Sequence, residues 1–379
     1  MENVSHTLAG FVLARSGLEE TTPLAATALV AGANLPDVDL AWSSFNSALA
    51  YFHYHRGWTH SLSGAALLAV SLWIVLLGVD RWIFARRSWA GARARPFPLL
   101  AAAIAGVASH LLLDAANSYG VRPLLPWSDR WMYGDLWVIV DPWLWLILGG
   151  AVYMTGRRGR RGVLVWSMGA AAAAIVVLSA PIVPAVCRAA WAAGLLLTVG
   201  VSRVTSRRPP AAGRPRIALA GLCLALVYAG LCLASHHAAL ARLESPNPND
   251  PGVAAGTVVA ALPLPADPLR WEAILADDHV IRHRTIGALP ILDPKADSWV
   301  VYQRRFDDPS VRTLLESCAG RVVLEFFRFP FATIEDEPDG GRSVVVRDAR
   351  YTRRGRGFAV FAARLAPDGA PVIDPGGCP

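Results

Sequence analysis

The chain has 379 residues, of which 54% are hydrophobic and only 17% are charged, and its formal net charge is +7 at pH 7. Soluble domains carry about 25% charged residues, whereas the apolar residues here gather in blocks close to the roughly 20 residues that a transmembrane helix needs. This composition excludes a single soluble domain, a disordered chain and a disulfide scaffold. The placement of the arginines decides whether the positive charge indicates nucleic-acid binding.

Six apolar blocks predict membrane-spanning helices. In chain order they are residues 62–79, 99–116, 136–154, 163–183, 186–201 and 217–235. Two earlier blocks, 7–13 and 23–35, are too short to cross a bilayer alone and suit a re-entrant or interfacial hairpin. The sequence therefore predicts a mainly α, polytopic helical membrane domain.

Fourteen arginines lie on three connections between these blocks. They are Arg81, Arg86, Arg87, Arg93 and Arg95, then Arg157, Arg158, Arg160 and Arg161, then Arg203, Arg207, Arg208, Arg214 and Arg216. The positive-inside rule places all three connections in the cytoplasm, and six spans then alternate without any insertion or deletion. The basic charge is thus topological, so we expect a multi-pass protein of the bacterial cytoplasmic (inner) membrane. Its partner is the lipid bilayer and not nucleic acid.

The tail after residue 240 changes character. Short β-type runs at 256–262, 299–304, 322–329, 343–346 and 357–363 are separated by turn residues, which predicts a small antiparallel β domain outside the membrane. Cys318 and Cys378 fall in this tail and could pair in an oxidising compartment. We therefore divide the chain into a metal-binding membrane domain at 1–155, additional transmembrane helices at 156–240 and an extracytoplasmic β-rich domain at 241–379.

Histidines and acidic residues concentrate in the first part of the chain. His110 and Asp114 are spaced i and i+4, which places both side chains on one helical face about 5–6 Å apart, where they can share one metal ion. Ionisable groups inside a span are expensive and usually functional. Asp37 and Asp39 flank a proline-stiffened turn that suits a bridging pair of carboxylates, although a solvent-facing turn gives the same pattern.

A second group of polar residues follows. His55 and His60 bracket Arg56, which combines metal ligands with a guanidinium fork suited to phosphate or carboxylate; an interfacial loop rich in polar anchors is the alternative. Asp135 and Asp141 bracket the start of the third predicted span. Asp141 precedes a proline and fits a helix N-cap equally well, and Asp135 fits a surface acid.

The predicted topology links these residues. His6 and all the residues named above lie before the first span or at the outer ends of the second and third, so the arginine pattern places every one on the same side. Structural histidines would scatter over both sides. A shared metal site with several ligands on the extracytoplasmic side is the simplest explanation.

These motifs resemble the YdjM-like bacterial inner-membrane metal-dependent hydrolases. The resemblance covers about residues 3–146 and rests on five stretches of sequence: Ser5-His6-Thr7; Leu35-Pro36-Asp37-Val38-Asp39; His55-Arg56-Gly57-Trp58-Thr59-His60-Ser61; His110 to Asp114 with Asn117-Ser118-x-Gly120; and Asp135 to Asp141-Pro142. The stretch His55–Ser61 is the most specific of these, and the Asp37-x-Asp39 pair is the least specific. Residues 262–271 also resemble the tail of longer family members.

The resemblance implies a divalent-metal hydrolase distantly related to zinc phospholipase C and P1-type nucleases. Carried across by motif, the ligands would be His6, Asp37, His55, His60, His110 and Asp114, and Arg56 would contact the anionic substrate. Asp141 completes the set of candidate metal ligands.

The predicted function is hydrolysis of a phosphoester by metal-activated water. The imidazole-rich set favours zinc, as two or three ions, with manganese or magnesium as alternatives. Asp39 or Asp135 would accept the proton of the nucleophile. Aromatic residues crowd the same face and suit a lipid or lipid-linked substrate, although an interfacial belt has the same composition. A non-enzymatic metal-binding transporter, sensor or scaffold is the alternative function.

Overall fold

The protein forms two compact units in a computed structural model that describes residues 1–43, 48–86, 92–156, 159–204, 213–245, 256–293, 298–338, 341–353, 356–357, 359–365 and 371–372. We call the first unit the membrane unit; it comprises Met1–Val38, Arg56–Ala234 and Pro263–Pro268. The second, the C-terminal unit, comprises Asp39–His55, Ser235–Leu262 and Leu269–Pro379. Residues Asp39–His55, which connect two of the predicted ligand motifs, thus belong to the same unit as the tail.

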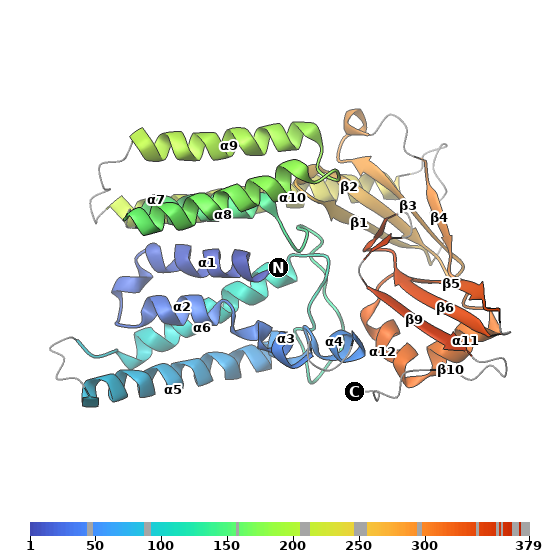
Figure 1. The fold of residues 1–379 in the computed structure, drawn as a ribbon, viewed down its shortest axis with the longest axis horizontal. Helices are drawn as coiled ribbons and strands as arrows, with labels where there is room; N and C mark the ends of the chain where they lie inside the picture. Colours follow the sequence, from blue (N-terminus) through green and yellow to red (C-terminus); the bar gives the residue numbers. More distant parts are fainter. Residues whose placement is uncertain are drawn as a thin grey trace. The chain divides into compact units, whose positions relative to one another are not determined.

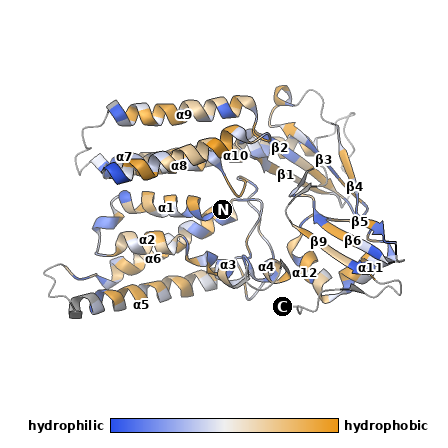
Figure 2. Cartoon of the chain, viewed as in Figure 1, coloured by the Kyte–Doolittle hydropathy of each residue, from blue (hydrophilic) through white to orange (hydrophobic). Residues whose placement is uncertain are grey.

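Helices dominate the first two thirds of the chain (Figure 1). They are α1 (Asn3–Arg15), α2 (Ala25–Gly32), α3 (Val38–Ser43), α4 (Ala48–Tyr54), α5 (Leu62–Arg86), α6 (Pro96–Ala115), α7 (Pro142–Thr155), α8 (Arg160–Ser179), α9 (Ala185–Val204) and α10 (Arg214–Glu244). Within the described ranges, five helices are long and apolar enough to cross a membrane, namely α5, α6, α8, α9 and α10. Figure 2 colours long stretches of the chain's helices as hydrophobic. The prediction of a polytopic helical membrane protein is confirmed.

The third predicted span is shorter than expected. Its helix, α7, begins at Pro142 instead of residue 136, because Asp141 caps it and Pro142 occupies its first turn. The preceding residues run beside the end of α6, where the Leu136 amide donates to the Ala116 carbonyl at 2.8 Å. The resulting helix has 14 residues, fewer than the roughly 20 of a typical span.

Small residues allow α1, α2 and α6 to approach closely. A Cβ on Gly10 of α1 would lie 2.8 Å from Val30 Cα, and one on Gly106 of α6 would lie 2.6 Å from the Leu29 carbonyl oxygen. Helices in membranes associate through such small-residue contacts because lipid offers no hydrophobic driving force. The two short blocks that precede the first span therefore pack as a helical hairpin against α6, and this packing sets the relative positions of the polar residues at the helix ends.

The C-terminal unit contains two four-stranded antiparallel sheets and a short two-stranded ladder. The first sheet has the order β1-β2-β3-β4 and the second β10-β9-β6-β5. The strands are β1 (Val258–Leu264), β2 (Asp267–Ala276), β3 (Val280–Gly287), β4 (Val300–Gln303), β5 (Pro330–Asp336), β6 (Arg342–Asp348), β7 (Thr352–Arg353), β8 (Arg356–Gly357), β9 (Val360–Leu365) and β10 (Pro371–Val372). The predicted antiparallel β region is confirmed.

Individual elements of the tail differ from the prediction. Residues 322–329, expected as a strand, lie mostly in α12 (Cys318–Phe326), which follows α11 (Pro309–Glu316). Ser317 caps α12 by accepting from the Gly320 amide at 3.1 Å, and its buried residues recur on one helical face. The β2–β3 hairpin was not predicted. Cys318 is disulfide-bonded, and Cys378 lies outside the described residues.

The stretch Asp39–His55 packs on α12 within the C-terminal unit. Phe52 of α4 stacks on Phe326, with ring centroids 4.9 Å apart, and meets Phe327 edge-on at 5.4 Å. Phe52 is buried as a result. The loop between two polar motifs of the membrane unit is thus held by aromatic contacts to the tail.

Candidate metal centre

Four buried side chains of the membrane unit converge at the ends of their elements. Asp37 ends the 3₁₀ turn Leu35–Asp37 after α2, and His60 ends the turn Trp58–His60 before α5. His110 and Asp114 lie one turn apart near the end of α6. One ligand atom from each of the four lies within 4.8 Å of the other three, so this group can hold a metal ion.

The two imidazoles face one another across the cluster. His60 Nε2 lies 3.1 Å from His110 Nε2, 3.4 Å from Asp37 Oδ1 and 3.3 Å from Asp114 Oδ2. His110 Nε2 lies 3.5 Å from Asp114 Oδ2. Two ring nitrogens at this separation need a proton or a cation between them, because their lone pairs otherwise repel. The carboxylates supply the negative charge that a cation requires.

Backbone contacts fix the orientation of one imidazole. His110 Nδ1 lies 2.8 Å from the Ala33 carbonyl oxygen at the end of α2. Since a carbonyl only accepts, Nδ1 carries the proton, and in the neutral ring Nε2 presents its lone pair to the cluster. This is the arrangement by which proteins orient metal-binding histidines, and it depends on the close packing of α2 against α6.

His6 of α1 borders the same cluster. Its ring stacks on that of His110, with centroids 3.8 Å apart, and its Nε2 lies 3.4 Å from Asp114 Oδ1. The side chain is fully buried, and neither ring nitrogen makes a hydrogen bond. Burial lowers the pKa of His6 to about 4, so the ring is neutral at pH 7. A neutral, buried imidazole without a partner is a donor available to a metal ion.

Asp37 is ionised in this environment. Burial by itself raises the pKa of its carboxyl, but the hydrogen bond from His60 and the electrostatic interaction with the neighbouring His110 imidazole together lower this pKa by more than burial raises it. The net shift of the pKa is downward. The cluster therefore presents at least one charged carboxylate to a cation at neutral pH.

Arg56 holds the other carboxylate in place. Its guanidinium donates to Asp114 Oδ1 at 3.0 Å, to Asn117 Oδ1 at 3.0 Å and to the Gly120 carbonyl at 3.2 Å, and it lies over the Tyr119 ring at 4.3 Å. The Met1 ammonium also contacts Asp114. Arg56 is 2% exposed and has a positive φ of 56°, a conformation that costs energy and collects at functional sites. Arg56 thus binds Oδ1 of Asp114, whereas His60 and His110 lie beside Oδ2.

Asp39 and His55 form a pair of their own in the C-terminal unit. Asp39 Oδ1 lies 3.2 Å from His55 Nδ1, and both side chains are buried. The His55 ring also stacks on Tyr51, with centroids 4.9 Å apart. A carboxylate on one ring nitrogen orients the other, which is the geometry of a histidine prepared for metal binding or proton transfer.

Asp135 and Asp141 have different surroundings. Asp135 is buried beside the end of α6, in a left-handed conformation with φ of 51°. Asp141 caps α7: its Oδ1 accepts from the amides of Trp143 and Leu144 at 2.9 and 3.1 Å, and its Oδ2 accepts from the Tyr228 hydroxyl at 2.9 Å. Helix capping accounts for Oδ1 and the Tyr228 hydroxyl for Oδ2, and Asp141 lies outside the four-residue group that can hold a metal.

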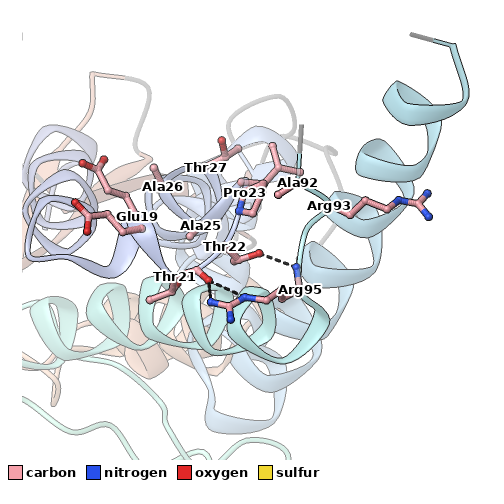
Figure 3. A pocket seen from close by; sticks show the side chains of 12 residues that line it. Glu19, Thr21, Thr22, Pro23, Ala25, Ala26, Thr27, Ala92, Arg93 and Arg95 are labelled. Atoms are coloured by element: carbon pink, nitrogen blue, oxygen red, sulfur yellow. Dashed lines mark hydrogen bonds between the residues drawn. The ribbon is translucent and has the colours of Figure 1, made fainter. Parts of the chain in front are cut away.

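The first arginine-rich connection lies at the opposite end of α6 from the cluster. Arg95 is the N-cap of α6 and His110 follows 15 positions later, or about 22 Å along the axis. At the Arg95 end, Arg93 and Arg95 line a surface cavity of about 530 Å³ together with Glu19 and Glu20 (Figure 3). Arg95 Nε donates to the Thr21 carbonyl there at 3.0 Å. The arginines of this connection and the ligands therefore lie at opposite ends of α6, and the side of the membrane that each end faces stays a prediction.

Sequence reasoning missed the role of two residues in the loop after α6. Asn117 accepts from Arg56 and from the Tyr119 amide, at 3.0 and 2.8 Å, and Tyr119 forms the aromatic platform for the guanidinium. Asn117 belonged to a quoted motif, but its spacing gave no indication that it serves Arg56. Only the fold brings these residues together.

The donor set fits a divalent metal ion. Two imidazole nitrogens and two carboxylate oxygens make a typical ligand set for zinc, and the buried Asp114 Oδ2 and the His6 nitrogens have no hydrogen-bond partner. Buried polar atoms are seldom left without one. A cation bound by the four-residue group would satisfy Asp114 Oδ2.

These features define a multi-pass membrane protein with a buried His/Asp cluster able to hold a metal. Residues 1–185 match the family model described as YdjM inner membrane protein, which confirms the resemblance to YdjM membrane proteins; the hydrolase activity expected from that resemblance stays a prediction. The uncharacterized protein YfhP of Bacillus subtilis (strain 168) is 27% identical over 141 residues, which cover 37% of this chain and 39% of YfhP. The match thus spans well under half of that relative. No solved structure matches the chain.

Proposed function

We propose that this protein is a membrane-embedded, divalent-metal-dependent hydrolase that cleaves a phosphoester of a lipid or lipid-linked substrate. The observation that carries the proposal is the convergence of two histidines and two aspartates within 4.8 Å in a buried cluster. A divalent ion held there would lower the pKa of a water toward neutrality and polarise a phosphoryl oxygen. Zinc suits the imidazoles, and manganese or magnesium suits the carboxylates.

The residues around the cluster have separate tasks in this proposal. Arg56 positions Asp114, and the Ala33 carbonyl fixes the tautomer of His110. Asp39 contacts His55 Nδ1, where it orients that ring. This leaves Asp135, held in an unusual backbone conformation, as the favoured acceptor for the proton of the attacking water.

The outer membrane face is the proposed location of the reaction. The cluster lies at the end of α6 remote from the Arg93–Arg95 connection, and arginine-rich loops stay in the cytoplasm. Trp58 and Trp127 are exposed. Trp58 precedes α5 and Trp127 follows α6, so both lie at the helix ends that carry the cluster. Indole rings prefer the headgroup level of a bilayer, where a lipid phosphoester is found.

A structural metal is the second candidate. His6, His60, His110 and Asp114 are all 0% exposed, and closed, fully coordinated sites are typical of structural zinc, whereas catalytic sites keep an open position. A scaffold stabilised by metal, or a sensor, fits this burial. The two candidates differ in turnover and in the response of the fold to chelation.

The test combines metal analysis with a substrate screen on the purified full-length chain. We expect zinc or another divalent metal by elemental analysis, and hydrolysis of at least one class among phosphodiesters, phosphomonoesters and phospholipids. His60→Ala and His110→Ala should lose both metal and turnover while still inserting into the membrane. His279→Ala is the matched control, because His279 is exposed in the C-terminal unit.

Two outcomes contradict the enzyme. Metal-loaded protein without turnover whose fold collapses on chelation indicates the structural role. Metal-loaded protein without turnover whose fold survives chelation indicates metal sensing or transfer. Normal turnover in His60→Ala or His110→Ala removes that residue from the ligand set.

A further inference from the structure

A second cavity of the membrane unit lies away from the metal cluster. It has a volume of about 520 Å³ and is lined by four helices, α1, α7, α8 and α9. Val4 and Leu8 of α1 contribute to one wall, Trp145 of α7 and Trp191 of α9 to others. The volume falls within the 300–1,000 Å³ of ligand pockets, which form readily between the helices of bundles.

Small residues create this space. Gly149 and Gly150 of α7 and Gly169 and Ala173 of α8 line the cavity, and a Cβ placed on Gly169 would meet no atom within 4 Å. The only charged lining residue is Arg203, at the far end of α9. The rest of the lining is mostly apolar, with Tyr153, Ser167 and Thr198 as its polar members, and a mostly apolar space favours hydrocarbon over ordered water. Its natural content is hydrocarbon.

The shape of the cavity indicates an extended chain. Its lining residues on α9 run from Trp191 to Arg203, twelve positions or about 18 Å along the helix. One leaflet of a bilayer supplies about 15 Å of hydrocarbon, half of the ~30 Å core. Because α8 and α9 are themselves long enough to cross the membrane, this space lies parallel to the acyl chains around it.

We infer that the cavity binds one acyl chain of a membrane phospholipid. Trp145 Nε1 donates to Glu2 Oε1 at 2.7 Å, and Trp191 Nε1 donates to the Pro142 carbonyl at 2.9 Å. Glu2 precedes α1 and Pro142 begins α7, so both indoles are anchored at the end of the cavity where these two helices begin. The bound chain packs on the Val4 and Leu8 face of α1, whose opposite face carries His6. The site is therefore a lipid site in its own right, and it does not depend on hydrolysis.

The test uses the full-length chain in nanodiscs of phosphatidylethanolamine and phosphatidylglycerol, with a trace of phosphatidylcholine that carries a diazirine near the end of one acyl chain. After photolysis, labelled peptides are mapped by mass spectrometry. We expect labelling at Leu146, Trp166 and other lining positions to exceed several-fold that at Val75, an exposed residue of α5. Gly169→Leu fills the cavity and should remove most of this excess.

Two variants keep the test sharp. Ala173→Leu fills the same cavity from the next turn of α8 and serves if Gly169→Leu is poorly produced. Gly230→Leu on α10 is the matched control, because its Cβ also meets no atom within 4 Å and it does not line the cavity; its labelling should equal that of the wild type. Labelling of the lining equal to that of Val75, or unchanged by both filling variants, overturns the inference. Crosslinks between two copies through these residues, in place of lipid labelling, also overturn it.

Discussion

Asp114 is the residue on which the candidate centre depends. One of its oxygens receives Arg56 and the Met1 ammonium, and the other faces His60 and His110. A buried carboxylate is tolerated only where opposite charge and hydrogen bonds compensate its desolvation. The guanidinium therefore does more than balance charge. One of its terminal nitrogens donates to Asn117 and the other to Asp114 Oδ1, which fixes the direction in which Asp114 Oδ2 points.

Arg56→Lys tests this positioning role. Lysine keeps the positive charge but has no planar fork, so it cannot hold Asp114 and Asn117 together. Loss of such an outer partner typically weakens metal binding by about 10–100-fold, and we expect a decrease of that size in a competition titration with a zinc chelator. Arg95→Lys, at the other end of α6, should bind as the wild type does. Equal affinity in Arg56→Lys would show that Asp114 needs no such support.

Asp141→Asn separates helix capping from metal binding. Asparagine is as good an N-cap as aspartate and can still accept from the Trp143 and Leu144 amides, but it is a poor metal ligand. We expect unchanged metal content and thermal stability. Asp141→Ala should keep the metal as well and lose about 0.5–2 kcal/mol of stability with the cap. Loss of metal in the asparagine variant would show that Asp141 is a metal ligand.

At the scale of elements, the sequence predicted most of the apolar helices and the grouping of the polar motifs, because long apolar blocks and i, i+4 spacings are local signals. It did not predict where α7 begins, since the Asp-Pro start lies inside a run, residues 136–154, that is otherwise apolar. It also assigned residues 322–329 to a strand, because Val322, Val323 and Phe326 suit either a strand or one helical face. The packing of α4 on α12 depends on contacts between residues some 270 positions apart, which no local pattern contains.

Gly106→Ala tests whether the packing of α2 on α6 sets the metal centre. The added Cβ would lie 2.6 Å from the Leu29 carbonyl oxygen, so the backbones must separate, and overpacking of this kind costs about 1–3 kcal/mol. Because the Ala33 carbonyl at the end of α2 holds His110, we expect a lower unfolding temperature and weaker metal binding together. Gly78→Ala on α5, where a Cβ meets no atom within 4 Å, should change neither. A destabilised variant with full metal affinity would show that the centre tolerates movement of α2.

At the scale of the whole molecule, the arginines and the candidate ligands fit one topology when α7 is counted as a sixth span beside the five longer helices. The Arg93–Arg95 connection and the His110–Asp114 pair lie at opposite ends of α6. In the sequence, the second arginine group lies at the start of α8 and the third at and beyond the end of α9, so both groups lie on one side when α8 and α9 both cross the membrane. If the positive-inside rule holds, the ligand cluster faces outward and the tail after α10 follows it. The disulfide at Cys318 is in accord with an oxidising compartment for the tail.

Reporter fusions test this topology directly. Alkaline phosphatase is active only outside the cytoplasm, and a fluorescent protein that folds only in the cytoplasm reports the reverse. We expect fusions after Tyr119 and after Glu244 to give phosphatase activity without fluorescence, and a fusion after Gly159 to give the opposite pattern. Fluorescence from the Tyr119 fusion would place the ligands beside the cytoplasm and exclude an outer-face hydrolase. Fluorescence from the Glu244 fusion together with phosphatase activity from the Gly159 fusion would leave the metal centre outside and place the tail inside, because α7, with its 14 residues, would then not be a span.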